Sequence, residues 1–453
     1  MTDRAQMTLA LFLNQTGHHE AGWRYPTAFV DGGANFGRYL EQAKLAEHAA
    51  FHFLFVPDSA GIRETRKSVV AHVARNDSFE PITLMSALAV TTKNVGLVAT
   101  ATTTYNEPYH IARKFASLDH LSNGRAGWNI VTSSNPLEAL NFSHQSHPGH
   151  DDRYARAHEF LEVVTALWDS WEDNAFPRDK LSGVYADISK LHFVEHTGER
   201  FKVRGPLNIA RPVQGHPVLV QAGTSTAGLE FAAKYGEVIF TAMQSPEEAR
   251  NYYDRIKTIA VGFGRKRTDL VVMPGIVPIV GQSEREARER LDVLQSLTHY
   301  EVGVEMANQV LGGVVDLRDY EIDAPLPTNL VQTELMKGRQ KILLQIAGER
   351  KLTIGGFIDL VSVGRGHNHI VGTATQVADR LQFMFDQGIA DGFNVMPAVL
   401  PDDLSTFCCE VVPILQDRGL FRRGFVGDTL RDNLQLGRPE SRFKEISNVC
   451  SAQ

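Results

Sequence analysis

The chain has 453 residues, and its 46 Lys and Arg against 53 Asp and Glu give a net charge of -7 with histidine neutral. This mildly acidic, ordinary globular composition gives no reason to expect nucleic acid or an anionic membrane surface as a partner. No apolar run reaches the roughly twenty residues of a bilayer span, and the N-terminus lacks the apolar core of a signal peptide. The three cysteines make no disulfide framework. We therefore expect a cytoplasmic protein without membrane association.

Short apolar runs alternate with helical spacing along most of the chain. The runs predict strands at residues 7–14, 51–58, 95–104, 126–132, 217–222, 238–242, 270–280 and 392–396. Helical spacing follows at residues 35–51, 80–92, 108–122, 152–171, 227–235, 246–261, 283–297, 375–387 and 404–418. Strands rich in Val, Ile and Leu without polar alternation are typical of a parallel sheet covered by helices. About eight such units predict a closed (β/α)8 TIM barrel, and a doubly wound open sheet is the alternative.

We expect one barrel domain over residues 1–436 and a C-terminal tail over 437–453. Three segments break the rhythm and are expected to be insertions, at about residues 60–79, 172–215 and 298–370. The third ends near His367-Asn368-His369, which could contribute to a lid. Neighbouring Cys408 and Cys409 lie in a helical pattern, and we expect them in the core. No His or Cys spacing resembles a metal site, so no metal is expected.

Small hydroxyl side chains gather where the predicted strands end. Thr102, Thr103, Thr104 and Thr132 end two of the strands, and a barrel builds its ligand site from such strand ends. A polar cofactor would use these hydroxyls, although they could also be ordinary β-branched strand residues.

The segment Gln221-Ala222-Gly223-Thr224-Ser225-Thr226 precedes a predicted helix. A glycine turn that brings backbone N–H groups and hydroxyls to a helix N-terminus is suited to phosphate. Simple capping of the helix by Ser225 or Thr226 is the alternative.

Three other positions belong to the same end of the predicted barrel. Asp58 follows the second strand, where it could contact a ligand or begin a turn. His18-His19 follow the first strand and could donate to an oxygen species or orient a substrate, or lie on a surface loop. Tyr154 could bind phosphate through its hydroxyl, or pack its ring against the barrel.

Neither of the common nucleotide fingerprints is present. The chain has no Gly-x-x-x-x-Gly-Lys-Ser/Thr motif, and the glycines at residues 31–37 do not reproduce Gly-x-Gly-x-x-Gly after a strand. A single phosphate site without a dinucleotide motif favours a mononucleotide such as FMN.

Eight short motifs, in order along residues 7–436, resemble those of the bacterial-luciferase-like flavin monooxygenases. The branch is the one that holds nitrilotriacetate monooxygenase component A, dibenzothiophene-sulfone monooxygenase and long-chain alkane monooxygenase. The motifs are Phe55-Val56-Pro57-Asp58-Ser59, Thr104-Tyr105 with Pro108-Tyr109-His110-Ile111-Ala112-Arg113, Leu118-Asp119-His120-Leu121-Ser122-Asn123-Gly124-Arg125, Gly127-Trp128-Asn129-Ile130-Val131-Thr132, Arg153-Tyr154, Ser182-Gly183-Val184-Tyr185-Ala186-Asp187, Gln221-Ala222-Gly223-Thr224-Ser225 and Gln416-Asp417-Arg418-Gly419.

The resemblance implies a barrel with FMN at the strand ends. It assigns the flavin ring to Asp58, Thr102 and Asn129, and the phosphate to a second group of residues. That group is Tyr154, Thr224 and Ser225. His19 and Trp128 are the candidate catalytic residues beside the reactive edge.

The resemblance also implies a two-component FMNH2-dependent monooxygenase. A separate NAD(P)H-dependent flavin reductase would supply FMNH2, and O2 would be activated as a flavin-(hydro)peroxide that transfers one oxygen atom to a small organic substrate. Organosulfur compounds, aminopolycarboxylates and alkanes are the candidate substrates, and we expect a homodimer or homotetramer. A non-catalytic flavin-binding protein and a deazaflavin-dependent oxidoreductase are the alternatives.

Overall fold

Eight parallel strands form a closed barrel in the computed structural model, which describes residues 6–62, 64, 66–223, 225–243, 246–327 and 337–443. In order around the ring they are β1 (Thr8–Phe12), β2 (Phe53–Val56), β3 (Gly96–Thr102), β4 (Ala126–Val131), β7 (Val218–Gln221), β8 (Val238–Thr241), β9 (Val271–Val280) and β11 (Gly392–Val395). The ring closes where Thr8 of β1 pairs with Gly392 of β11. The predicted TIM barrel is therefore confirmed, and the open sheet is excluded.

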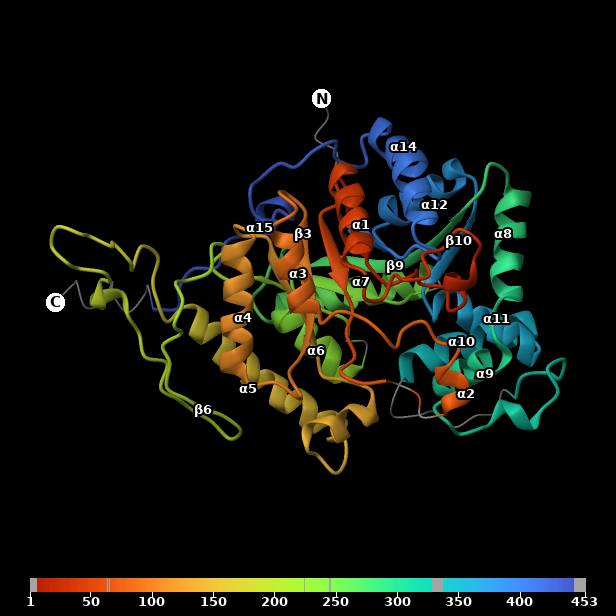
Figure 1. Ribbon diagram of the computed structural model, residues 1–453, viewed down its shortest axis with the longest axis horizontal. Coiled ribbons are helices and arrows are strands. Elements are labelled where there is room, and N and C mark those ends of the chain that lie inside the picture. Colours follow the sequence, from red (N-terminus) through yellow and green to blue (C-terminus); the bar gives the residue numbers. More distant parts are fainter. Residues whose placement is uncertain are drawn as a thin grey trace.

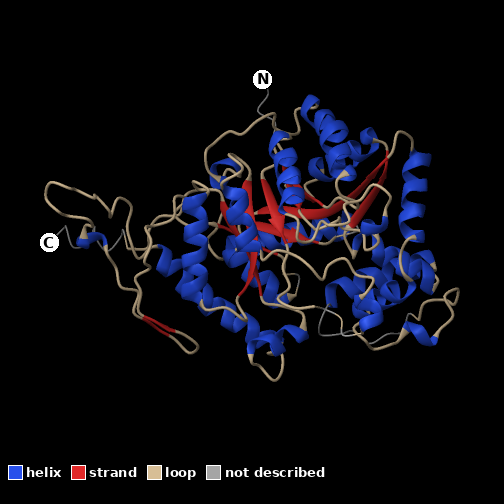
Figure 2. Ribbon diagram, in the orientation of Figure 1, coloured by secondary structure: helices blue, strands red, loops and turns tan. Residues whose placement is uncertain are grey.

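Helices cover the outside of the barrel (Figures 1 and 2). The helices that surround the barrel are α1 (Phe36–His48), α3 (Pro81–Ala89), α4 (Pro108–Leu121), α5 (His150–Trp168), α6 (Thr226–Tyr235), α7 (Pro246–Gly262), α8 (Glu284–Ser296), α12 (Ala374–Asp386) and the closing pair α13 (Asp402–Thr406) and α14 (Val412–Asp417). Capping side chains close in sequence mark where several of these helices begin. The Glu80 carboxylate accepts from the N–H groups of Ile82 and Thr83 ahead of α3, and Thr373 and Gln376 form a capping box at α12.

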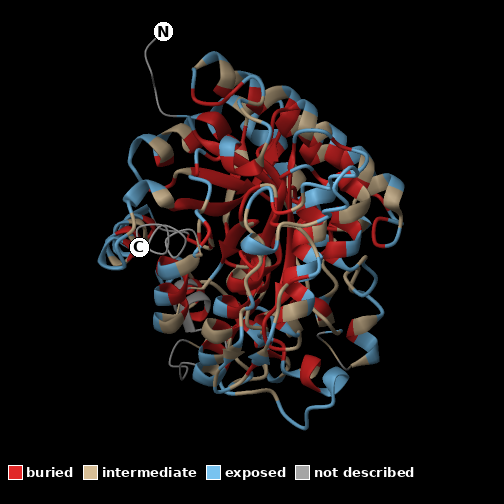
Figure 3. Cartoon of the chain, turned by 90° about the vertical axis from the view of Figure 1, so that its left-hand side faces the viewer, coloured by how far each residue is buried: buried red, intermediate tan, exposed pale blue. Residues whose placement is uncertain are grey.

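Strand residues alternate between the barrel interior and the helix layer. On β4, Gly127 faces inward, where a Cβ would lie 2.8 Å from Val98, whereas Trp128 packs among the outer helices. Both faces are apolar, and Figure 3 shows the buried residues concentrated on the strands and on the inner sides of the helices. The interior ends in an aromatic layer of Phe12, Phe55 and Phe240.

The third insertion has its own fold. It contains α9 (Tyr300–Val310), α10 (Lys337–Arg350) and α11 (Ile354–Gly364), which share a small apolar core at the lower right of Figure 1. A ninth strand, β10 (Asn368–Gly372), was not predicted. It pairs in parallel with the second half of β9, outside the ring. Its five residues carry two polar side chains at the start, so the apolar pattern that marks the barrel strands is missing.

The second insertion extends away from the barrel as an arm that includes the hairpin of β5 (His196–Thr197) and β6 (Lys202–Val203) (Figure 2). Leu181 is fully exposed and Ile188 is 82 % exposed on this arm. The division into one domain with a tail stays a prediction. The first insertion carries α2 (Lys67–Val70), which packs against α9.

The neighbouring cysteines Cys408 and Cys409 differ in their exposure. Cys408 is buried as expected, but Cys409 is exposed, which corrects the expectation that both lie in the core. Successive helical residues point about 100° apart, so only one of the two can face the barrel.

Among the helices of the described residues, none is long and apolar enough to cross a bilayer.

Candidate active site

A pocket of about 220 Å³ opens at the carboxyl-terminal ends of β2, β3, β4 and β7. Three residues expected at the cofactor, Asp58, Thr102 and Tyr154, line it together. The remainder of the lining comes from the last residues of these strands and from the segments that follow them: Ser59, Ala60, Ile130, Val131, Thr132, Ser133, Ser134, Glu138, Gln221, Ala222 and Gly223. Parallel strands all present their carboxyl ends at one face of a barrel, which is why residues so distant in sequence meet here.

One wall of the pocket is a hydroxyl network built around Glu138. The Glu138 carboxylate accepts from Ser59 Oγ at 2.9 Å and from Ser133 Oγ at 2.6 Å. Ser133 Oγ also lies 2.9 Å from Thr102 Oγ1. The sequence pattern did not single out Glu138, because it lies in η2 (Pro136–Phe142), outside the strand ends. The network fixes the side chains that a bound polar ligand would meet.

The opposite end of the pocket meets the N-terminus of α6. Ser225 caps this helix, since its Oγ accepts from Gly228 N at 3.1 Å, and it also lies 3.1 Å from His150 Nε2. Tyr154 forms hydrogen bonds here, and burial raises its pKa, so its hydroxyl stays protonated at neutral pH. Helix capping and phosphate binding by Ser225 are thus compatible with each other, because the capping hydroxyl lies at a helix N-terminus, which favours anions.

Two glycines allow the close approach of the chain at this helix end. A Cβ at Gly223 would lie 2.7 Å from the Cα of Gly228, and a Cβ at Gly228 would lie 2.6 Å from Tyr154 Oη. Any larger residue would therefore displace either the backbone or the tyrosine hydroxyl. Thr224, which was expected beside Ser225 at the phosphate, lies outside the described residues.

A buried arginine next to Tyr154 was not assigned a role from the sequence. Arg153 Nη1 donates to Pro148 O at 2.6 Å, but its buried Nε has no hydrogen-bond partner among the described residues. Burial lowers the pKa of Arg153, and the nearest titratable groups that act on it are the hydroxyls of Tyr154 and Tyr105 rather than a carboxylate. This cation adds positive charge near the N-terminus of α6.

Asn129 points into the barrel below the pocket. Its Nδ2 donates to Thr100 Oγ1 at 2.9 Å, while its buried Oδ1 has no partner among the described residues. An orphaned acceptor in the barrel interior is costly unless a ligand donor reaches it. Asn129 itself does not line the pocket.

His19 lies in the loop after β1 and is buried. Its Nδ1 accepts from Ala21 N at 3.1 Å, so the proton of the neutral ring is on Nε2, which has no partner among the described residues. Burial, together with Arg75 and Arg365, lowers the pKa of His19 to about 3. His19 is therefore neutral at physiological pH, and its Nε2–H is available as a hydrogen-bond donor. It does not line the pocket beside Asp58.

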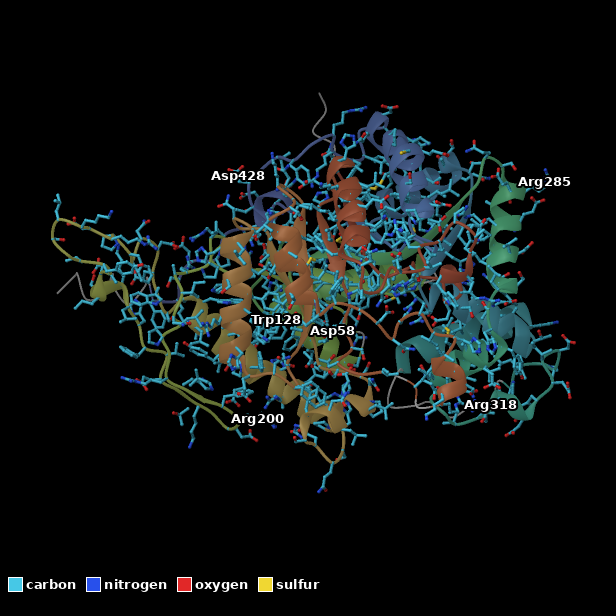
Figure 4. All side chains as sticks on the ribbon, in the orientation of Figure 1. Asp58, Trp128, Arg200, Arg285, Arg318 and Asp428 are labelled. Carbon is cyan, nitrogen blue, oxygen red and sulfur yellow. The ribbon has the colours of Figure 1, made fainter. Side chains whose placement is uncertain are left out.

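Trp128 does not lie beside the pocket, which corrects the sequence expectation. Its fully buried ring packs against Phe115, Phe160 and Trp168, and its Nε1 donates to Ala101 O at 3.0 Å. Trp128 lies on β4, whereas Asp58 follows β2, and both residues are labelled in Figure 4. The alternation of β4 directs Trp128 to the helix layer, so its role is to pack α4 and α5 on the barrel.

The comparisons with known proteins agree with this geometry. The family described as luciferase-like monooxygenases matches residues 7–391. The chain belongs to this family. The expected resemblance and the expected class of enzyme, a flavin-dependent monooxygenase, are thus confirmed.

Individual relatives match over nearly the full length. The chain is 46 % identical to N-acetyl-S-(2-succino)cysteine monooxygenase of Bacillus subtilis (strain 168), covering 97 % of this chain and 99 % of that protein. It is 44 % identical to nitrilotriacetate monooxygenase component A of Aminobacter aminovorans, covering 96 % and 98 %. A crystal structure of riboflavin lyase with modified FMN and riboflavin matches with a TM-score of 0.85 at 30 % identity, covering 95 % of each chain.

Proposed function

We propose that the protein is the oxygenase of a two-component system, which uses FMNH2 and O2 to insert one oxygen atom into a small organic substrate. The observation that carries the proposal is the N-terminus of α6, capped by Ser225, which meets the hydroxyl-lined pocket. Gly223, Gly228 and Tyr154 approach one another closely at this helix end, and the hydroxyl-lined pocket extends from Gly223 and Tyr154 to Asp58. This layout suits a mononucleotide and fits FMN.

The residues divide into two groups in this proposal. Ser225, Tyr154 and the helix N-terminus would hold the phosphate, with Arg153 supplying a balancing charge and Thr224 completing the predicted set. Asp58, Thr102 and Asn129 would contact the ring, and the orphaned Asn129 Oδ1 would accept from a ring N–H. The pocket volume of about 220 Å³ is below the usual range of about 300–1,000 Å³ for cofactor sites, so the ring would extend beyond it into the barrel mouth.

When bound, reduced FMN would supply the electrons that activate O2. The chain's own contribution is to orient the ring, to present the neutral His19 Nε2–H as a fixed donor, and to keep water from the reacting centre. A separate NAD(P)H-dependent flavin reductase would supply FMNH2. One relative is named nitrilotriacetate monooxygenase component A, and the name is consistent with a system of more than one protein. A homodimer or homotetramer remains our proposal for the assembly.

The test uses the purified full chain under anaerobic conditions and then with O2. Reduced FMN should bind more tightly than oxidised FMN, and NADH should bind weakly because the sequence carries no dinucleotide-binding fingerprint. With a flavin reductase, O2 and a panel of organosulfur compounds, aminopolycarboxylates and alkanes, one class should give an oxygenated product. Tight NADH binding in a one-to-one complex would contradict the proposal.

Two outcomes would favour the alternatives. Turnover with a deazaflavin and without O2 would indicate a deazaflavin-dependent oxidoreductase. Tight flavin binding with no product from any substrate class would indicate a non-catalytic flavin-binding protein. The helical third insertion argues against a carrier, because a carrier has little need of a lid.

A further inference from the structure

One side of the pocket is a buried carboxylate surrounded by hydroxyl groups, which we call the Glu138 wall. Its members all line the pocket, and they are Ser59, Thr102, Ser133 and Glu138. Glu138 is only 3 % exposed. In the order of the strands around the barrel, Thr102 and Glu138 lie between Asp58, which follows β2, and Gly223, which follows β7 and leads to α6. The wall is therefore the middle of the pocket.

The turn after β4 directs Glu138 back toward the strand ends. Asn135 Oδ1 accepts from Leu137 N at 3.1 Å and so caps η2, the short helix that carries Glu138. Ser133, between β4 and η2, has a φ of +52°. This left-handed conformation costs a residue other than glycine about 1–3 kcal/mol, and such strain concentrates at ligand sites. Ser133 Oγ lies 2.6 Å from Glu138 Oε2 in this arrangement.

The hydroxyl protons of the Glu138 wall are all used within the protein. A carboxylate only accepts hydrogen bonds, and a hydroxyl has a single proton to donate. Ser133 donates its proton to Glu138, so its bond of 2.9 Å with Thr102 Oγ1 is made by the Thr102 proton. Ser59 Oγ lies 2.9 Å from Glu138 Oε1 and 3.1 Å from Gly61 O, and its proton is engaged by one of these two acceptors.

The wall consequently offers a ligand acceptors and no hydroxyl donor. Thr102 Oγ1 accepts from Thr104 N at 3.1 Å, and Ser133 Oγ accepts from Thr102, so each of the two oxygens keeps one lone pair. The Glu138 carboxylate keeps further lone pairs beyond those that its serine partners use. A ligand that meets this wall must bring O–H or N–H donors, and the negative charge of Glu138 repels an anionic group.

The end of the pocket at α6 has the opposite preference. The N-terminus of this helix, capped by Ser225, and the protonated hydroxyl of Tyr154 favour an anion. The pocket thus favours an anion at one end and hydrogen-bond donors along its middle. A phosphate joined to a chain of hydroxyl-bearing carbons satisfies both preferences, and FMN has this pair of groups next to its ring.

From this arrangement we propose that Glu138 binds the polyol chain of FMN and sets the direction in which the cofactor lies. The hydroxyls of the chain donate to the Glu138 carboxylate and to Ser133 Oγ, which Glu138 holds as an acceptor. The same charge keeps the phosphate away from the wall and at the N-terminus of α6. This inference rests on the proposed function, because FMN is the cofactor of that proposal.

The test measures the affinity of the full chain for two flavins that differ only in the hydroxyls of the chain. One is FMN, and the other is an analogue in which a phosphopentyl chain replaces the ribityl phosphate, so that ring and phosphate are kept. Anaerobic titration of the protein fluorescence with each reduced flavin gives two dissociation constants. The wild type should bind FMN about tenfold or more tightly than the analogue, because the analogue makes no hydrogen bond to the carboxylate.

Glu138→Gln should lower this preference for FMN to threefold or less. The new amide group has to donate to one of the serines, which turns that serine's proton toward the pocket, and the negative charge of the wall is lost. The affinity for the analogue should stay within threefold of the wild type. Ser133→Gly, which suits the left-handed backbone, should also lower the preference and gives a second test should Glu138→Gln fail to fold.

Glu47→Gln is the matched control, because Glu47 is a carboxylate at the opposite end of the barrel. Its Oε1 accepts from the backbone N–H groups of Lys93, Asn94 and Val95, just before β3 begins. This variant should lose stability in urea unfolding and keep the wild-type preference for FMN over the analogue.

Three outcomes would overturn the inference while FMN still binds. They are equal affinity of the wild type for the two flavins, the wild-type preference in both Glu138→Gln and Ser133→Gly, and a loss of affinity in these variants that is the same for both flavins. The last outcome would show a purely structural role for Glu138. A wild type that binds neither flavin would refute the proposed function itself, and this inference with it.

Discussion

Replacing Ser225 separates the two roles that the structure gives it. Its Oγ accepts from Gly228 N at 3.1 Å as the N-cap of α6, and it faces the proposed phosphate position beside Tyr154. Loss of an N-cap costs about 1 kcal/mol of folding stability. Loss of a hydrogen bond to a charged group costs about 1.5–3 kcal/mol. The second cost corresponds to an FMN affinity that falls by about 10-fold to 150-fold.

Three substitutions distinguish these effects. Ser225→Ala should lose both stability and FMN affinity by the amounts above. Ser225→Asp should keep the cap, and so stay within about 0.5 kcal/mol of the wild type in stability, because aspartate is as good an N-cap as serine. Its charge should repel the phosphate and weaken FMN binding more than alanine does. Ser225→Thr keeps the hydroxyl and serves as the conservative control.

Two assays are needed, since one reports binding and the other folding. Anaerobic fluorescence titration gives the Kd for reduced and oxidised FMN, and urea unfolding of the flavin-free chain gives the stability. If Ser225→Asp binds FMN within twofold of the wild type, no phosphate lies at the N-terminus of α6, and the reasoning that begins from this helix end is refuted.

Three further perturbations address other parts of the site. Gly228→Ala should weaken FMN binding at least fivefold in titration, because the new Cβ would lie 2.6 Å from the Tyr154 hydroxyl. It should also lack the gain in folding stability of about 0.5–1 kcal/mol that alanine usually brings to a helix. Unchanged FMN affinity would mean that the close approach of Gly228 and Tyr154 is not needed. His19→Gln should lose about 2 kcal/mol less stability than the wild type between about pH 7.5 and pH 5 in urea unfolding. In the folded protein the His19 imidazole, with a pKa of about 3, takes up no proton in this range, whereas in the unfolded chain it does. Protonation therefore favours the unfolded chain, and stability of the wild type is lost as pH falls. Equal losses in the wild type and in His19→Gln would contradict the buried neutral state of His19. Replacing α9 to α11 with a short linker should leave FMN binding nearly intact, while the yield of product per NADH falls and hydrogen peroxide rises. Asp58→Ala should instead lower flavin affinity or turnover without this selective uncoupling. A shortened protein that loses FMN binding but keeps its yield of product per NADH would assign the insertion to the cofactor site.

The sequence alone determined the barrel and predicted the end of it at which the candidate pocket lies. Eight apolar runs of strand length between helical patterns leave few folds that bury both faces of every strand. The hydroxyls after β3 and β4, and the Gly223 turn before α6, needed only the rule that parallel strands end together. Thr102, Asp58 and Tyr154 accordingly line one pocket.

The tertiary structure decided which side chains face that site. A barrel strand is apolar on both its inner and outer faces, so its sequence does not show which of two neighbouring residues points inward. In the structure Trp128 packs under α4 and α5, whereas Asn129 faces the barrel interior. The pairing of β10 with β9 is equally invisible along the chain, because its register depends on residues about ninety positions apart. The neutral state of His19 depends on its burial and on Arg75 and Arg365 from other segments, which is a property of the assembled fold.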